Sequence, residues 1–91
     1  MEEMNIHIQF FGSFKKFGSG LFVSINQKSK VCDLRNLLQI EIQKKYPTTE
    51  INHLKDELAR SRFATEEKLL AETQELMDGI KIAIIPPVSG G

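Results

Sequence analysis

The chain has 91 residues, of which 41% are hydrophobic and 26% are charged. This composition is typical of one small globular domain and is too apolar for a disordered chain. Twelve basic residues balance twelve acidic ones, and this zero net charge argues against nucleic-acid binding through a basic surface. No segment approaches the roughly 18 apolar residues of a membrane span, and the acidic residues 1–4 do not resemble the basic head of a signal peptide.

Side chains that commonly perform catalysis or bind metals are sparse. The chain contains two histidines, His7 and His53, and one cysteine, Cys32. A single cysteine can form neither an intramolecular disulfide nor a four-ligand zinc site. We interpret Cys32 as a partly buried apolar residue, His7 as an outward-facing strand residue and His53 as part of a solvated surface. We therefore expect a protein of a reducing compartment, the cytoplasm, without a metal site or a conventional active site of its own.

Alternating hydrophobicity predicts two strands in the first third of the chain. Residues 4–11 and residues 21–26 both alternate between apolar and polar side chains. The core-facing positions expected from this alternation are Ile6, Ile8, Phe10, Leu21, Val23 and Ile25. Residues 12–20 contain three glycines and predict a loop, so the two strands are expected to pair antiparallel.

Helical periodicity begins after the second strand. Apolar residues recur every three or four positions over 31–46, which predicts a helix. Its expected buried stripe consists of Val31, Leu34, Leu37, Leu38, Ile42 and Tyr46. Ser29 is the predicted N-cap, and Pro47 ends the helix because a residue before proline disfavours the helical conformation. Ile51, Leu54 and Leu58 indicate a short second helix within residues 48–60.

The last third combines an ambiguous segment with a clear strand. Residues 61–77 are rich in glutamate, lysine and leucine, and their periodicity alone predicts a helix. The Asp-Gly pair at 78–79 predicts a turn, and the residues IKIAII at 80–85 predict a strand. Its expected core-facing residues are Ile80, Ile82 and Ile84. The two prolines at 86–87 end this strand because proline has no N–H to donate to a sheet.

The final segment, Pro-Pro-Val-Ser-Gly-Gly at 86–91, is the most informative feature. The prolines favour an extended backbone, and Gly90 and Gly91 carry no side chains. Six extended residues reach roughly 20 Å, so such a tail could enter a narrow tunnel in another protein. We expect it to present the α-carboxylate of Gly91, which becomes reactive once activated, as in an acyl-adenylate. The alternative is a frayed end whose glycines have no role.

This tail resembles that of a known family. Residues 84–91, Ile-Ile-Pro-Pro-Val-Ser-Gly-Gly, are similar to the C-terminal signature of the small subunit of molybdopterin synthase, a sulfur carrier. The resemblance extends to Phe10-Phe11, to Lys-Lys-Phe-Gly at 15–18 and to Val-Cys-Asp-Leu-Arg at 31–35. It spans most of the chain, and its highly specific part is the tail. Related ubiquitin-like carriers also end in Gly-Gly but generally lack the preceding Pro-Pro-Val-Ser.

The resemblance implies an α+β fold of the ubiquitin-like β-grasp type, in which a mixed sheet packs on one main helix. Residues 1–85 would form the domain and 86–91 a flexible tail. The helix predicted at 61–77 would be replaced by a strand over 62–66, a turn, and a short return strand over 68–70. The first and last strands would lie parallel at the centre of the sheet, which agrees with their apolar character.

Three apolar residues are then expected on the sheet face that the helix leaves open: Phe11, Leu69 and Ile85. We interpret them as a patch that docks on partner proteins near the exit of the tail. Scattered surface apolar residues without a role are the alternative. Phe10 and Ile84, their neighbours in sequence, would face the helix.

The resemblance also implies a mechanism centred on Gly91. An E1-like adenylyltransferase would use ATP to adenylate its carboxylate, and a sulfur donor would displace AMP to leave a thiocarboxylate. The tail would then deliver sulfur to a cyclic pyranopterin precursor in the large subunit of molybdopterin synthase, within a 2:2 heterotetramer, to form the dithiolene of molybdopterin. Guiding the tail would fall to Pro86, Pro87, Val88 and Ser89, and Gly90 would give clearance.

In this interpretation the chain is a non-catalytic sulfur-donor subunit. It binds no cofactor permanently, uses ATP only through the transient acyl-adenylate, and has neither nucleic acid nor membrane as a partner. Two alternatives stay open. The chain could carry sulfur for another product, such as the thiazole of thiamine or cysteine. It could also be a ubiquitin-like modifier that forms isopeptide bonds through Gly91.

Overall fold

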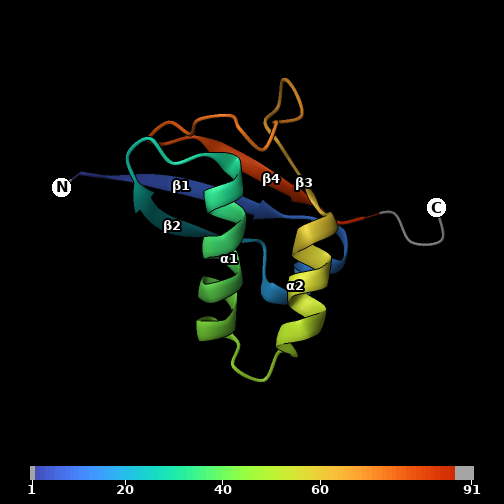
Figure 1. Cartoon of the computed structure of the whole chain (residues 1–91). Coiled ribbons are helices and arrows are strands. Elements are labelled where there is room, and N and C mark those ends of the chain that lie inside the picture. Colours follow the sequence, from blue (N-terminus) through green and yellow to red (C-terminus); the bar gives the residue numbers. More distant parts are fainter. Residues whose placement is uncertain (1, 88–91) are drawn as a thin grey trace.

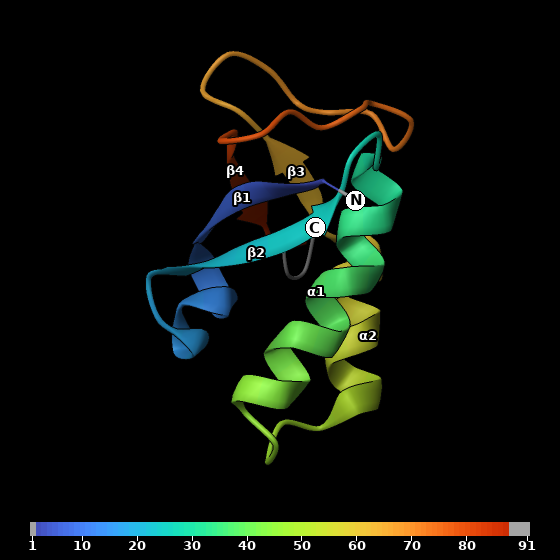
Figure 2. The ribbon, with the colours of Figure 1, turned by 90° about the vertical axis from the view of Figure 1, so that its left-hand side faces the viewer.

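The computed structural model describes residues 2–87 (Figure 1). The elements follow in the order β1 (Glu3–Phe10), the 3-10 helix η1 (Gly12–Phe17), β2 (Gly20–Asn26), α1 (Val31–Lys45), α2 (Ile51–Arg60), β3 (Arg62–Ala64) and β4 (Lys81–Ile85). Within this part of the chain the four strands form one sheet, and α1 and α2 lie on the same side of it (Figure 2). The architecture is the α+β fold that the resemblance implied.

The sheet has the strand order β2-β1-β4-β3. β1 pairs antiparallel with β2, as the alternation in the first third of the chain predicted. β1 also pairs in parallel with β4, with Phe10 opposite Ile84, and β3 pairs antiparallel with β4, with Phe63 opposite Ile84. The strands nearest the two ends of the chain are therefore the central strands, and this prediction is confirmed.

A single apolar core lies between the sheet and the helices. In β1, β2 and β4 buried residues alternate with more exposed ones, because successive side chains point to opposite faces. The core residues of the central strands are Met4, Ile6, Ile8, Phe10, Ile82 and Ile84, all at most 2% exposed. The helices contribute Val31, Leu34, Leu38, Ile42, Leu54 and Leu58. The predicted stripe of the first helix is thus buried, with Leu37 and Tyr46 packed at its margin.

The two helices have the predicted extents, with one correction at the start of α1. The N-cap is Lys30 rather than Ser29, since the backbone N–H of Lys30 donates to Asp33 Oδ2 at 2.9 Å. Aspartate in the first turn of a helix closes the N-terminus in the way a capping box does. Cys32, in the same turn, is exposed rather than partly buried. In residues 2–87 neither helix combines the length and the apolar character needed to cross a bilayer.

The segment predicted as a loop after β1 contains a helix instead. η1 folds over Gly12–Phe17 and buries Phe14 and Phe17. These rings pack on Phe10, with ring centroids 6.4 and 6.3 Å away from that of Phe10. The three glycines of residues 12–20 suggested a turn, whereas the burial of the two phenylalanines determines the structure.

The helix that periodicity predicted over 61–77 is wrong. Residues 62–64 form β3, and the chain then turns back so that Ala64 pairs with Leu69. The N–H of Leu70 donates to Phe63 O at 2.8 Å. The strand implied by the resemblance is therefore present but ends at residue 64 instead of 66, and the return strand is reduced to a single bridge.

Candidate functional site

The candidate site is the point where the tail leaves the domain. β4 ends at Ile85, and Pro86 and Pro87 follow it half-buried. Pro86 lies against Gly12, because a Cβ atom placed on that glycine would be 2.7 Å from Pro86 Cγ. Figure 1 shows this end of β4 emerging beside the upper end of α2. The rest of the predicted tail, Val88, Ser89, Gly90 and Gly91, lies outside the described residues.

The three residues of the predicted docking patch share the sheet face opposite the helices. Phe10 and Ile84 are paired and buried, so the next residues, Phe11 and Ile85, point to the other face; they are 42% and 39% exposed. Leu69, 58% exposed, pairs with Ala64, which in turn pairs with Ala83 on that face. The structure therefore brings the three residues, Phe11, Leu69 and Ile85, to one face, and their docking role stays a prediction.

The same face carries an aromatic pair that the sequence analysis did not single out. Phe22 on β2 is 74% exposed and stacks on His7 of β1, with ring centroids 4.3 Å apart and an interplanar angle of 13°. Lys81 lies opposite His7 on the other side. The alternation that places Leu21 and Val23 in the core also predicts an outward Phe22, so the signal was present in the sequence.

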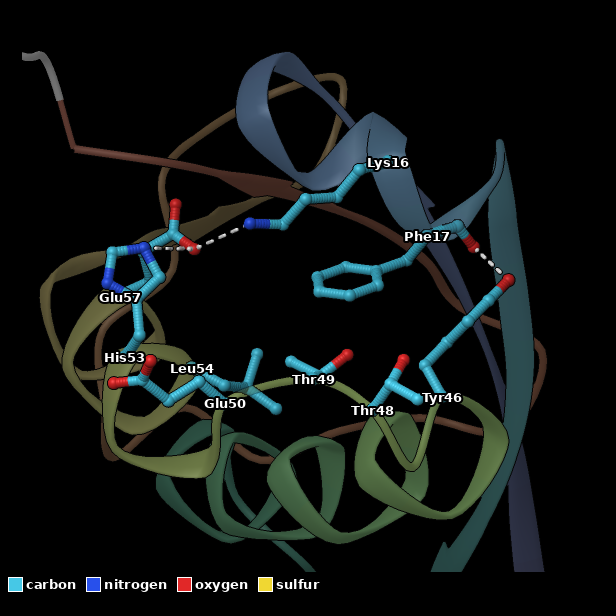
Figure 3. A pocket seen from close by; sticks show the side chains of 9 residues that line it. All are labelled: Lys16, Phe17, Tyr46, Thr48, Thr49, Glu50, His53, Leu54 and Glu57. Carbon is cyan, nitrogen blue, oxygen red and sulfur yellow. Dashed lines mark hydrogen bonds and ion pairs between the residues drawn. The ribbon is translucent and has the colours of Figure 1, made fainter.

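Beside the tail exit, η1 is joined to α2 through Glu57. The Ser13 hydroxyl donates to Glu57 Oε2 at 2.7 Å. The other oxygen, Oε1, lies 3.7 Å from Lys16 Nζ and 3.8 Å from His53 Nε2 (Figure 3). Glu57 is only 9% exposed. We refer to Ser13, Lys16 and Glu57 as the η1 clamp. No sequence pattern indicates it, because it depends on where η1 packs.

The η1 clamp borders a pocket of about 410 Å³ between η1, the α1–α2 loop and α2. Figure 3 shows Phe17 and Tyr46 along one side of this pocket and Glu57 at its far end. The Tyr46 hydroxyl donates to Phe17 O at 2.7 Å, so the pocket wall is tied to η1 as well. His53 lines the pocket with its side chain 64% exposed, as a solvated helix face predicts.

A second cluster is centred on Arg35 of α1. Its guanidinium lies over the ring of Phe63, 4.7 Å from the centroid. It donates to Ser61 O at 2.9 Å and to Leu58 O, and forms a two-point ion pair with Glu72. This cluster links α1 to the end of α2, to β3 and to the following loop.

The residues considered as metal ligands lie on different elements. His7 is on β1, Cys32 on α1 and His53 on α2. Within residues 2–87 no group of three or more histidine, cysteine, aspartate or glutamate side chains is arranged to hold a metal ion.

The sequence matches the model of the ThiS family over residues 8–91. The matched region includes nearly the whole domain and the complete tail. A comparison with curated proteins gave no match.

Solved structures of ubiquitin-like proteins are similar to this chain over almost its whole length. A putative molybdopterin converting factor subunit 1 from Pyrococcus furiosus is 20% identical, with a TM-score of 0.68 over 93% of this chain and 99% of that one. A chain of the complex of subunits 1 and 2 of molybdopterin-converting factor from Helicobacter pylori is 27% identical, with a TM-score of 0.58 over 97% and 100%.

The ubiquitin of Caldiarchaeum subterraneum is also similar, at 22% identity and a TM-score of 0.62, with 99% of this chain and 100% of that chain covered. These likenesses confirm the ubiquitin-like fold. Together with the family match they confirm the resemblance from which that fold was predicted.

Proposed function

This chain belongs to the ThiS family of ubiquitin-fold sulfur carriers, and from this premise we propose that it carries sulfur on Gly91 for the synthesis of molybdopterin. One observation carries the proposal: the family match runs through residue 91, so the matched region includes the Gly-Gly tail. The Pro-Pro-Val-Ser before the glycines and the likeness to molybdopterin-converting factors favour molybdopterin as the product. The proposal takes Gly91 as the last residue of the mature protein.

Activation is the first step of the proposed cycle. On an E1-like adenylyltransferase, a carboxylate oxygen of Gly91 attacks the α-phosphorus of ATP and pyrophosphate leaves. A donor then supplies sulfur at the oxidation level of sulfide, and this sulfur attacks the carbonyl carbon. The bond from that carbon to the phosphate oxygen breaks, AMP leaves, and Gly91 becomes a thiocarboxylate. No oxidant or reductant is consumed.

Sulfur delivery is the second step. The thiocarboxylate sulfur forms a bond to a carbon of the cyclic pyranopterin precursor, the carbon–oxygen bond at that carbon breaks, and the oxygen takes up a proton as it leaves. Water then cleaves the acyl–sulfur bond and restores the carboxylate of Gly91. Each carrier supplies one sulfur atom, so a dithiolene takes two loaded carriers. A tethered nucleophile held in a partner's active site reacts as if at very high concentration, which is the advantage of carrying sulfur on a docked protein.

We propose that the partner for delivery is a large subunit, in a 2:2 assembly. The Helicobacter pylori structure contains subunits 1 and 2 of a molybdopterin-converting factor, which supports such a pairing. The patch of Phe11, Leu69 and Ile85 borders the tail exit and is exposed, so it is suited to dock on both the adenylyltransferase and the large subunit. Pro86 to Ser89 would guide the tail and Gly90 would give clearance.

Intact-protein mass spectrometry tests the carrier function. The full chain is co-expressed with the adenylyltransferase of its own organism, and we expect a species heavier by the mass difference between sulfur and oxygen. A chain extended by one residue after Gly91 is the matched control and should show no such species. If the chain with a thiocarboxylate on Gly91 never forms, the hypothesis of a sulfur carrier is overturned, for molybdopterin and for any other product. Isopeptide-linked conjugates in its place would identify a modifier.

Identification of the stable partner tests the product. We expect the chain to co-purify with a molybdopterin synthase large subunit and to convert a cyclic pyranopterin to molybdopterin once loaded. Capture of a thiazole synthase alone would overturn the molybdopterin assignment while leaving the carrier function intact.

A further inference from the structure

η1 contacts both the start of the tail and the second helix. Its first residue, Gly12, lies against Pro86. The next residue, Ser13, donates to the buried carboxylate of Glu57 at 2.7 Å, and Lys16 lies 3.7 Å from the same carboxylate. We call Pro86, the first residue of the tail, the tail root. One contact joins the tail root to η1, and two contacts join η1 to α2.

We propose that η1 and its clamp position the tail: Gly12 sets the direction in which Pro86 leaves the sheet, and Glu57 holds η1 in the place where it can do so. This inference rests on the proposed function, because the direction matters only if the tail must enter a partner's active site. Gly12, Ser13 and Glu57 are positioning residues, since none of them would touch the reacting carboxylate.

Gly12 is the residue in direct contact with the tail root. Its φ is +57°, and an added Cβ would lie 2.7 Å from Pro86 Cγ and 3.4 Å from Pro86 Cδ. A side chain there would have to displace the proline ring. Because two successive prolines form a stiff segment, a small rotation at the root is carried outward. For an extended tail of six residues, a rotation of about 10° moves the far end by roughly 3 Å.

Glu57 attaches η1 to a helix that is itself anchored in the core. The carboxylate belongs to α2, whose apolar face is anchored in the core by Leu54 and Leu58. A buried charge is costly unless it is paired. Among the described residues Glu57 Oε1 has no hydrogen-bond donor, and its neighbours are the charge of Lys16 and the ring of His53. The buried carboxylate of Glu57 therefore has two partners in η1. Ser13 is the residue next to Gly12, and Lys16 lies near the end of η1.

The expected effect of misplacing the tail is kinetic. Displacement of a reacting group by about 1 Å can lower the rate of a step by about 100-fold, even when the substitution lies far from the chemistry. Docking of the domain itself depends on the exposed patch, which these residues leave in place. We therefore expect a change in kcat and an unchanged KM for the carrier.

The first test compares Gly12→Ala with Gly79→Ala in adenylation by the adenylyltransferase, using the full chain. Gly79 has a φ of +82° with no atom within 4 Å of an added Cβ, so it bears similar backbone strain without touching the tail. We expect Gly12→Ala to lower kcat by about 10- to 100-fold with KM within about twofold, and Gly79→Ala to leave both unchanged. Equal kcat values in the two variants would overturn the inference.

The second test uses the clamp and does not depend on a glycine. Glu57→Gln keeps the shape of the side chain but removes the charge that holds Lys16 and weakens the bond from Ser13; we expect kcat to fall by roughly three- to tenfold. Asp56→Asn, which removes the exposed pair with Arg60 on the same helix, is the control and should be neutral. An unchanged kcat in Glu57→Gln would overturn the role of the clamp.

Nuclear magnetic resonance gives a readout independent of activity. An NOE between Gly12 Hα and the ring protons of Pro86 is expected in the wild-type chain and in Gly79→Ala, and its absence from the wild type would overturn the contact itself. Failure of the wild-type chain to be adenylated would overturn the proposed function, and this inference with it. If the wild-type chain is adenylated and Gly12→Ala is equally active, this inference is overturned and the proposed function stands.

Discussion

At the scale of single residues, Arg35 connects several separate elements. Its side chain is only 16% exposed, and its planar guanidinium serves two backbone carbonyls, one carboxylate and one aromatic face together. A lysine could not replace this geometry, because its ammonium is a compact charge without the planar fork. The carbonyls of Leu58 and Ser61, at the junction of α2 and β3, would lose this donor without Arg35.

We predict that Arg35→Met lowers the free energy of unfolding by about 2 kcal/mol, because two partly buried carbonyls lose a charged donor while the apolar contact with Phe63 is kept. Arg60→Met is the matched control: its ion pair with Asp56, at 3.2 Å, is exposed on both sides and should contribute less than about 0.5 kcal/mol. Urea unfolding followed by circular dichroism measures both. Equal losses in the two variants would contradict the role of Arg35.

At the scale of elements, the loop between β3 and β4 explains why the predicted helix over 61–77 does not form. The first turn of a helix has N–H groups without partners inside the helix. The N–H groups of Val31 and Cys32 in α1 donate to the carbonyls of Gln74 and Glu72, at 3.0 and 3.1 Å. In a helix over 61–77 the carbonyl of Glu72 would instead accept from the N–H of residue 76, so tertiary pairing overrides the local preference.

The sequence was sufficient where the pattern is local. The alternation in β1, β2 and β4 and the stripe of α1 predicted these elements and most of their buried residues. Leu21 and Ile80 are only partly buried. The 3-10 helix η1 and the η1 clamp could not be predicted in this way. Their residues are brought together by packing between segments more than forty positions apart. The exposed Phe22 follows from alternation, and the role of the tail stays a prediction.

The open face of the sheet allows the docking patch to be tested. We predict that Leu69→Ser and Ile85→Thr each raise the KM for adenylation about tenfold, because apolar residues at the centre of an interface carry much of its binding energy. Both side chains are exposed, so stability should change by less than about 0.5 kcal/mol.

Met77→Ser is the matched control for the docking patch. Met77 is 70% exposed, and it lies beyond the end of β4 opposite to the tail exit. We expect its KM to equal that of the wild type. A rise in KM as large as that of Leu69→Ser would show that the activating enzyme does not bind near the tail.

At the scale of the whole molecule, the described part of the chain is built around one continuous core. Residues from the strands, from η1 and from both helices belong to the same buried cluster. A small domain of this kind has little independent stability in any part, so it is expected to unfold in one step.

We predict that the urea transitions seen by far-UV circular dichroism and by tyrosine fluorescence coincide. Tyr46 is the single tyrosine and the chain has no tryptophan, so its fluorescence reports the contact of its hydroxyl with Phe17 O in η1. Circular dichroism reports the helices and the sheet. A tyrosine transition at clearly lower urea would mean that η1 detaches before the core unfolds, which contradicts a single cooperative unit.

The parallel pairing of β1 with β4 has a consequence during translation. A nascent chain that has emerged from the ribosome only through β3 lacks β4, one of the two central strands, so one edge of β1 is unpaired and Ile8 lacks its partner Ile82. Such long-range pairing also makes folding comparatively slow. A polypeptide truncated before Ile85 cannot complete the sheet and is therefore exposed to proteolysis. A polypeptide translated beyond Ile85 contains β4 and continues into the tail. Under the proposed function, protein turnover would remove chains that lack the tail before they compete for the adenylyltransferase.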